Sequence, residues 1–276
     1  MLQFKGLNIN VFVSHFHAEY DRAKDIYVGH RVMQALEAAQ WIKLTSSGAD
    51  LTIYAGDFNT EPTDVPYWLL RTVAQLQDSW SECHQSDAQG LTCDTSYNTY
   101  KSSQNSVGKR IDYIMYRPGT SLSNTGVTCQ SCHLPLNRRI PESLSARVGR
   151  EISYSDHEAV TSVIRVEKNA GGAGDNSWSH MCRSLVTKRE ETVTLAMDLI
   201  NKAIVGTSRD QKFYSLLLVV ALVLFMCTFT QLLYSGLILE CAMFLVRLIL
   251  SLTAVYALCM ATVFNRYDLI INLLIF

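Results

Sequence analysis

Hydrophobic and polar positions divide this chain into two unlike parts. Up to about Asp210 apolar residues are interspersed with polar and charged ones, whereas from Lys212 onward Leu, Val, Ile, Phe, Ala and Met dominate. Within the first part, the mostly apolar runs at 7–14 and 51–55 predict two buried strands. Apolar residues recur at helical spacing over 21–44, so the order strand, helix, strand predicts a βαβ-like layer with helices over a sheet.

The segment 21–44 gives the clearest helical pattern of the first part. Asp21 suits a helix cap, and Asp25 and Arg31 lie off the apolar stripe, which consists of Ile26, Val32, Met33, Leu36, Ala39 and Ile42. The other predicted elements are a helix at 66–76, a polar surface loop at 78–107, a strand at 109–116, a loop-rich stretch at 118–150 and a strand at 160–166.

The second part predicts a membrane anchor. Residues 213–233 contain no charged side chain and are long enough to cross a bilayer, and a second apolar stretch follows at 243–264 after a short connection at 234–241. The run at 170–174 is rich in glycine, which is typical of a flexible linker. The predicted divisions are a domain at 1–168, a Gly-rich linker at 169–183, an amphipathic juxtamembrane helix at 184–210 and a transmembrane helical hairpin at 211–276.

Charge and composition narrow the function classes. The net charge is −1, so no basic surface for nucleic acid is predicted. Arg209 and Lys212 precede the hairpin and Arg266 follows it, so the positive-inside rule predicts that the first domain is cytosolic. The first ten residues lack the pattern of a secretory signal, which agrees with reduced cysteines. Cys129 and Cys132 form a lone C-x-x-C, a weak zinc signal that we interpret as incidental thiols.

Candidate chemistry begins where the strand at 51–55 ends. Asp57 and Asn59 follow Gly56 with one residue between them, so an extended backbone places both side chains on the same side. A carboxylate can bind a hard cation or hold a water, and an amide can donate to a phosphoryl oxygen. An Asx-rich turn is the alternative. His15 and His17 follow the strand at 7–14, and either is a candidate metal ligand, phosphate donor or packing residue.

Two further acidic positions accompany a histidine. Asp112 interrupts the predicted strand at 109–116, where a carboxylate is costly to bury unless it is paired. It either forms an ion pair with Arg110 or another cation, or orients a catalytic imidazole. Asp156 and His157 precede the strand at 160–166, and histidine suits proton transfer because its ordinary pKa lies near neutrality.

The ordered combination of these motifs resembles the endonuclease/exonuclease/phosphatase superfamily, which has the DNase I-like fold, a four-layer α/β sandwich. More narrowly, His15-Phe-His-Ala-Glu-Tyr20, the helix around His30-Arg-Val, Arg110-Ile-Asp-Tyr113 and Ser155-Asp-His-Glu-Ala159 look like the membrane-bound, Mg²⁺-dependent neutral sphingomyelinases. The resemblance covers about residues 9–166. It implies hydrolysis of sphingomyelin to ceramide and phosphocholine, with endoplasmic reticulum or another intracellular membrane as the location.

The resemblance also implies residue roles. His157 matches the general base that activates water, and Asp112 matches the residue that pairs with its imidazole. Asp57 and Asn59 match a pair that positions water and contacts phosphate near the metal. His15 matches a histidine that stabilises the phosphoryl transition state and contacts substrate. Asp156 matches a residue at the edge of the Mg²⁺ site.

The chain departs from the family pattern ahead of His15. The resemblance implies two upstream segments, one with an Asn near the metal and one with the principal Glu ligand of Mg²⁺, and neither has a match in this chain. We therefore expect an N-terminally truncated, partial DNase I-like domain. Three readings stay open: a phosphodiesterase acting on sphingomyelin or a lysophospholipid, a nuclease or phosphatase on the same fold, and a non-catalytic membrane protein.

Overall fold

The computed structural model divides the chain into two compact units, Met1–Met197 and Asp198–Phe276, so the division falls inside the predicted juxtamembrane helix. The predicted Gly-rich run at 170–174 lies outside the described residues, and so does part of the predicted connection at 234–241. The described residues are 1–84, 89–103, 105–119, 125–141, 149, 151–168, 175–228 and 237–275, with side chains left undescribed at 125, 168, 175–184, 237–240 and 264–275.

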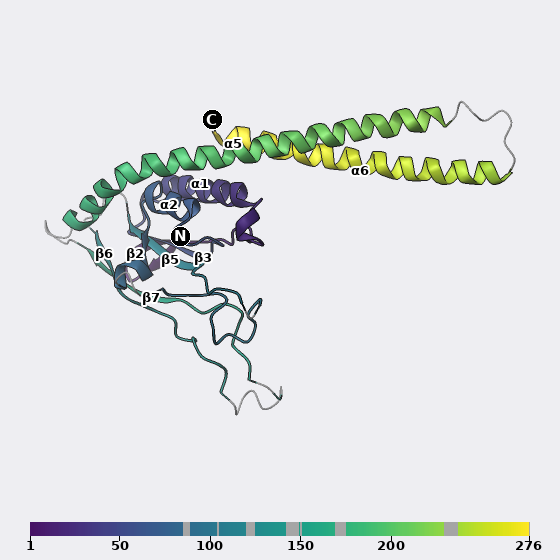
Figure 1. Ribbon diagram of the computed structural model, residues 1–276. Helices are drawn as coiled ribbons and strands as arrows, with labels where there is room; N and C mark the ends of the chain where they lie inside the picture. The colour runs from purple at the N-terminus through teal and green to yellow at the C-terminus, as the bar shows by residue number, and fades with distance from the viewer. Residues whose placement is uncertain are drawn as a thin grey trace. The chain divides into compact units, whose positions relative to one another are not determined.

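A five-stranded mixed sheet forms the centre of the first unit (Figure 1). The predicted βαβ-like layer is confirmed, because β2 and β3 pair in parallel with α1 between them. The other pairs in this sheet are antiparallel. The strand order is β1-β2-β3-β5-β4, with bounds Leu2–Phe4 for β1, Leu7–Val13 for β2, Leu51–Asp57 for β3, Gln77–Asp78 for β4 and Asp112–Pro118 for β5.

Helices cover one face of this sheet. Figure 1 shows α1 (Val28–Thr45) and α2 (Val65–Thr72) side by side over it, and the short α3 (Ser79–Cys83) follows β4. Large, almost fully buried side chains form the core between the helices and the sheet. Burying their apolar surface away from water stabilises the fold. These side chains include Val32, Ile42, Tyr54, Phe58, Leu69, Leu70 and Met115.

The helix predicted over 21–44 begins later than expected. Asp21 caps a separate 3-10 turn, η1 (Arg22–Lys24), by accepting from two backbone amides of that turn, and α1 starts only at Val28. Ile26 consequently lies outside the helix and is 73% exposed rather than part of the stripe. Arg31 was expected at the surface but is 2% exposed, because its guanidinium pairs with Asp25.

A second sheet corrects the prediction of loops over 118–150. β6 (Thr125–His133) pairs antiparallel with β7 (Thr161–Lys168), with a register shift between Cys129 and Ser131. The C-x-x-C therefore lies in a strand. Cys129 Sγ is 3.2 Å from Cys83 Sγ, and the metal-ligand clusters found among the described residues include none of these thiols.

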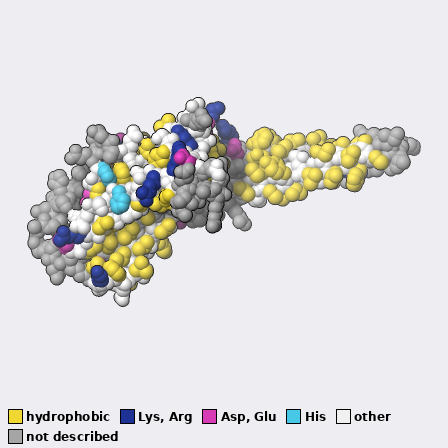
Figure 2. All heavy atoms as spheres, turned by 90° about the horizontal axis from the view of Figure 1, so that it is seen from below, with side chains coloured by type: hydrophobic (Ala, Val, Ile, Leu, Met, Phe, Trp, Pro, Cys, Tyr) yellow, Lys and Arg dark blue, Asp and Glu magenta, His cyan; other side chains and the backbone are white. Residues whose placement is uncertain are grey.

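Two long helices account for the described residues of the second unit apart from Thr228, and the first of these helices begins within the first unit. The first of them, α5 (Asp175–Cys227), begins inside the range 169–183 that the sequence assigned to the linker and runs unbroken through the predicted juxtamembrane helix. α6 (Leu237–Ile275) likewise extends beyond the predicted end at 264. Both contain stretches long and apolar enough to cross a membrane, and only 6% of each stretch is buried. Figure 2 shows the hydrophobic side chains that cover them.

Candidate active site

The site begins where β3 ends beside the start of β5. In this antiparallel pair Asp57 lies directly opposite Asp112, so the two carboxylates come from adjacent strands at one edge of the sheet. Two like charges at this spacing repel unless a cation or a proton lies between them. The strand register therefore creates a place for positive charge.

Gly56 allows the end of β3 to approach the end of β2. Its φ of +145° is a conformation that residues with a Cβ rarely adopt, and a Cβ there would stand 1.9 Å from the carbonyl oxygen of Ser14. Backbone bonds continue the pairing, with the Phe16 amide donating to the Asp57 carbonyl at 2.9 Å. This close approach brings His15, between Ser14 and Phe16, alongside Asp57.

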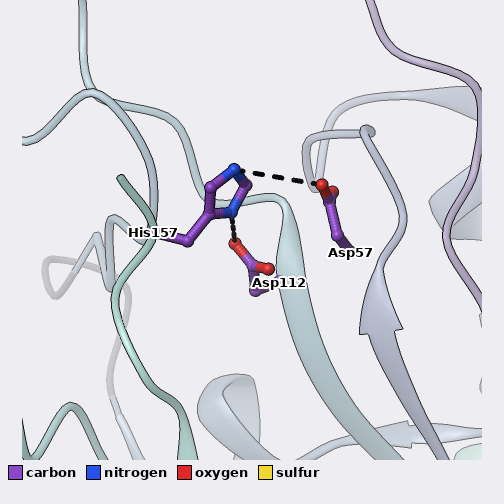
Figure 3. Close-up of side chains that lie close together, drawn as sticks. All are labelled: Asp57, Asp112 and His157. Atoms are coloured by element: carbon purple, nitrogen blue, oxygen red, sulfur yellow. Dashed lines mark hydrogen bonds and ion pairs between the residues drawn. The ribbon is translucent and has the colours of Figure 1, made fainter. Parts of the chain in front are cut away.

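His157 completes the centre of the site (Figure 3). Its Nδ1 lies 2.8 Å from Asp112 Oδ2, and its Nε2 lies 4.0 Å from Asp57 Oδ2. An isolated bridge between the backbones of Cys93 and His157 holds this segment, and Cys93 also pairs with Lys109, which precedes β5. The imidazole therefore has one nitrogen fixed by a carboxylate and the other facing Asp57.

Asn59 and His15 meet the same Asp57 carboxylate from other sides. The Asn59 backbone amide donates to Asp57 Oδ1 at 2.8 Å, and its side-chain amide donates to Asp57 Oδ2 at 3.2 Å and to the Phe16 carbonyl at 3.0 Å. His15 Nε2 lies 3.3 Å from Asp57 Oδ2, and its side chain is 72% exposed. Asp57 and Asn59 therefore form an Asx turn, which was the alternative reading of this motif, and the same turn holds the Asp57 carboxylate in the candidate site.

Electrostatics at the site favour a charged imidazole. The hydrogen bond with Asp112, followed by one with Cys93, outweighs burial and raises the pKa of His157 to about 11. Burial raises the pKa of Asp57 above its usual value, with Asp112 adding to the rise, while the hydrogen bond from the Asn59 amide and the two histidines oppose it. Burial and Asp112 thus favour the uncharged form of Asp57, whereas the Asn59 amide and the two histidines favour its charged form.

The alternative that Asp112 pairs with Arg110 is not what the structure shows. Arg110 Nη1 lies 2.7 Å from Asp78 Oδ2, while its guanidinium carbon lies 4.8 Å from the centre of the Tyr113 ring. Asp112 pairs instead with the imidazole of His157. Arg110 precedes β5, which begins at Asp112, so its side chain is not bound to the face on which Asp112 lies.

A buried ion-pair network supports the loop that carries His15. Glu19 Oε1 lies 2.8 Å from Lys109 Nζ, and its Oε2 lies 2.7 Å from Arg22 Nη1. Burial by itself raises the pKa of Glu19, but the hydrogen bonds from Lys109 and Arg22 lower it further than burial raises it. Glu19 therefore ties the loop after β2 to the segment that leads into β5.

Five of the six sequence-predicted site residues converge, namely His15, Asp57, Asn59, Asp112 and His157. Asp156 does not join them: it is exposed, and its carboxylate accepts a hydrogen bond from Ser155 Oγ at 3.0 Å. Sequence reasoning missed Cys93 and also Thr92, whose hydroxyl oxygen accepts from the Asp112 amide at 3.1 Å. Both lie in a polar loop where no pattern distinguishes them.

The donor set at the centre suits a divalent cation in part. Asp57, Asp112 and His157 each offer one ligand atom, and these atoms lie within 4.8 Å of one another. Two carboxylates match the oxygen preference of Mg²⁺, which commonly takes one or two carboxylates and completes its shell with water and phosphate oxygens. The contact between His157 Nδ1 and Asp112 Oδ2 holds the imidazole, so the Asp57 carboxylate and the other oxygen of Asp112 are the natural ligands here.

The profile of the Endonuclease/Exonuclease/phosphatase family matches residues 3–157, a range that contains all six predicted site residues. The mixed sheet covered by helices is the DNase I-like arrangement expected from the sequence. Members of this superfamily generally depend on a divalent metal, which agrees with the carboxylate pair.

Several relatives act on sphingolipids according to their names. A Caenorhabditis elegans protein that carries the name of a neutral sphingomyelinase is 32% identical over 238 residues, covering 79% of this chain and 50% of that protein. Mus musculus sphingomyelin phosphodiesterase 2 is 34% identical, covering 60% of this chain and 38% of the enzyme. Schizosaccharomyces pombe inositol phosphosphingolipids phospholipase C is 25% identical, covering 59% and 41%. This chain spans half or less of each relative's length.

Proposed function

Because the chain belongs to the endonuclease/exonuclease/phosphatase family, we propose that it is a sphingomyelin phosphodiesterase, which hydrolyses sphingomyelin to ceramide and phosphocholine. The observation that carries the proposal is the convergence of Asp57, Asp112 and His157 in one site. The relatives named for sphingomyelin cleavage supply the substrate class.

A lipid substrate fits this chain better than a nucleic acid. Binding to a nucleic acid backbone needs clustered Lys and Arg, whereas the net charge here is −1. Two helices with long apolar stretches suit a protein whose substrate lies in a bilayer. We extend the proposal to a membrane-embedded protein with its hydrolytic unit on the cytosolic side, following the basic residues at both outer ends of the hairpin.

Each residue has a definite task in this proposal. His157 Nε2 takes the proton of the attacking water, while Asp112 holds the opposite ring nitrogen and so fixes the orientation of the imidazole. Asn59 and His15 donate to phosphoryl oxygens as negative charge develops on them, with Asn59 turning one side-chain N–H from Asp57 Oδ2 to the phosphate. Asp57 lies between the two histidines and holds the water in line. Asp156 borders the site from outside and contributes least.

Mg²⁺ is the proposed cofactor, held by the carboxylates of Asp57 and Asp112 together with substrate phosphate. Bound there, it would neutralise part of the phosphoryl charge. Cation charge near the imidazole also disfavours the protonated ring, so it opposes the rise in the pKa of His157 and leaves more of the ring available as a base.

The test is release of phosphocholine from sphingomyelin in mixed micelles by the full chain. We expect release with Mg²⁺, none with chelator, and a loss of about a thousandfold in His157→Ala, as removal of a general base gives. His133→Ala is the matched control, since His133 is exposed on β6 and outside the site. Release from a lysophospholipid but not from sphingomyelin would move the proposal to that substrate, and release from neither would reject it.

A further inference from the structure

A groove runs between β2 and α1 on the first unit. Its volume is about 510 Å³, within the range of sites that hold small organic ligands. One wall is the end of β2 and the other is the outer face of α1. The residues that line it are Phe12, Val13, Ser14, His15, Phe16, Gln34, Glu37, Ala38, Gln40, Trp41, Ile42, Leu44 and Tyr54.

The walls of this groove expose large apolar side chains. Val13 is 76% exposed, Trp41 59% and Leu44 75%, whereas the core of the same unit fully buries other apolar side chains, including Val32, Leu69 and Leu70. Two polar atoms inside the groove satisfy each other, because Ser14 Oγ and Tyr54 Oη form a hydrogen bond. An apolar ligand would therefore contact apolar side chains, and it would not leave either hydroxyl group without a hydrogen-bond partner.

The groove is continuous with the site already described. His15 lines the groove, and its Nε2 lies 3.3 Å from Asp57 Oδ2. Phe16 also lines it, and the Phe16 carbonyl accepts from Asn59, the proposed phosphate donor. A molecule whose phosphoryl group lies at Asp57 and His157 therefore has this groove beside it.

We propose that the groove between β2 and α1 binds a hydrocarbon chain of the lipid substrate. The inference rests on the proposed function, because a sphingolipid phosphodiester carries its hydrocarbon chains only a few bonds from phosphorus. A phosphoryl group next to His15 places the first carbons of such a chain at the mouth of the groove. Val13, Trp41 and Leu44 then bury their exposed apolar surface against it.

Chain burial has a magnitude that an experiment can resolve. Full burial of one Leu side chain contributes about 1.5–3 kcal/mol, which corresponds to roughly tenfold or more in affinity. Replacing Leu44 with Asp removes that contact and places a charge where hydrocarbon would lie. Leu44 is 75% exposed, so the substitution leaves the core of the unit intact.

The experiment uses a sphingomyelin with a photoreactive diazirine midway along its acyl chain. The full chain in detergent micelles is irradiated with chelator present, so that no turnover occurs, and labelled peptides are mapped by mass spectrometry. We expect labels within 12–16 and 34–44, competed by excess unlabelled sphingomyelin but not by phosphocholine. Leu44→Asp lowers this labelling about tenfold. Val107→Asp, at a site 80% exposed and outside the groove, leaves it unchanged.

Two results would overturn the inference. One is labelling confined to the apolar stretches of α5 and α6, and the other is groove labelling that Leu44→Asp does not reduce. Neither depends on catalysis. Failure of the proposed function appears instead as absence of phosphocholine release by the wild-type chain in a separate assay, whatever the labelling pattern.

Discussion

The two units of this protein place their side chains in opposite ways. In the first unit charged side chains such as Arg31, at 2% exposure, and Asp78, at 1%, are buried in ion pairs, while large apolar side chains form the core. In the second unit apolar side chains cover the outside of the helices, and only 6% of each candidate span is buried. The first is the pattern of a protein folded in water, and the second is compatible with helices that cross a membrane.

The two units place different demands on the positions of their side chains. Asp57, Asp112 and His157 work only at defined distances, so the first unit depends on register, turns and ion pairs. The helices need only length and low polarity to enter a bilayer. Arg247 lies within the candidate span of α6 and donates to the carbonyl and hydroxyl oxygens of Thr228, so this charged group has hydrogen-bond partners.

Charging the apolar surface of α6 has the largest expected effect. Leu252 and Val255 are exposed helix positions, where a soluble helix would tolerate Arg with little change. In a bilayer each Arg costs about 3 kcal/mol at the centre of a span, so the double variant Leu252→Arg, Val255→Arg loses about 6 kcal/mol of insertion free energy. We expect it to leave the membrane fraction after alkaline carbonate extraction.

The control is Leu252→Ile with Val255→Ile, which keeps the apolar surface and stays in the membrane fraction. If the Arg variant also stayed, the two helices would belong to a water-exposed or protein-covered structure, and the contrast between the units would disappear.

The same Gly→Ala change should have opposite signs in the two units. In Gly56→Ala the new Cβ meets the Ser14 carbonyl oxygen at 1.9 Å, and the backbone of β2 has no free rotation that would relieve the clash, so we expect a loss of about 3 kcal/mol in unfolding free energy. In Gly206→Ala, within α5, the Cβ meets no heavy atom within 4 Å, and helix propensity adds up to about 1 kcal/mol.

Denaturant titration of the full chain in detergent micelles measures both changes. Equal and small effects from the two variants would mean that the close approach of β2 and β3 is not a feature of the folded protein.

Asp112→Asn tests the electrostatics of the site. In the wild type the hydrogen bond with Asp112 is the main cause of the high pKa of His157, about 11. Without that carboxylate the pKa falls toward the usual 6.5, so the acid limb of kcat/KM moves to lower pH. The plateau also falls about a hundredfold because the imidazole loses its orienting partner. Phosphocholine release measured from pH 6 to 11 reports both changes, with Asp198→Asn in the second unit as control.

The same pair predicts how stability depends on pH. A raised folded-state pKa means that the ion pair stabilises the protein fully below the unfolded value of 6.5, and that this contribution disappears as pH rises through about 11. The free energy of unfolding of the wild type should therefore decrease over this window more steeply than that of Asp112→Asn. Parallel curves would contradict the pairing of His157 with Asp112.

Asp156→Asn has the smallest expected effect. The resemblance puts this residue at the edge of the Mg²⁺ site, whereas its carboxylate is exposed and bonded to Ser155. Exposed ionic contacts contribute about 1 kcal/mol or less, so the Mg²⁺ concentration for half-maximal activity should rise no more than about fivefold. A rise of a hundredfold would make Asp156 a direct metal ligand and add it to the cluster.

Most of the regular elements of the first unit were predictable from the sequence. β2, β3, β5 and β7 follow apolar or alternating runs, and α1 follows helical spacing, because burial of one face leaves a periodic trace. β6 was missed because its sequence, rich in Cys, Ser and Thr, alternates only weakly. The start of α1 was misplaced because Asp21 caps a separate turn, and a cap signal alone does not reveal how many residues the helix then contains.

The candidate site was predictable as a set of residues but not as a geometry. Residue type and position relative to strand ends singled out Asp57, Asn59, Asp112 and His157, with resemblance deciding for His15 over His17. The sequence left Asp112 with two possible partners, and only the structure joined it to His157 and gave Arg110 to Asp78. Pairing between residues 45 positions apart depends on register and loop closure, which no local pattern records.

The sequence by itself determined that this chain has a water-compatible α/β part and a strongly apolar helical part. Burial of one face of an element gives a periodic hydrophobic pattern, and a helix long enough to cross a bilayer gives a long apolar stretch. Only the tertiary structure decided which carboxylates face each other, which of them holds the imidazole, and that an apolar groove opens beside His15. The physical reason is that hydrophobic patterning acts between neighbours along the chain, whereas a reaction site depends on distances between residues that folding alone brings together.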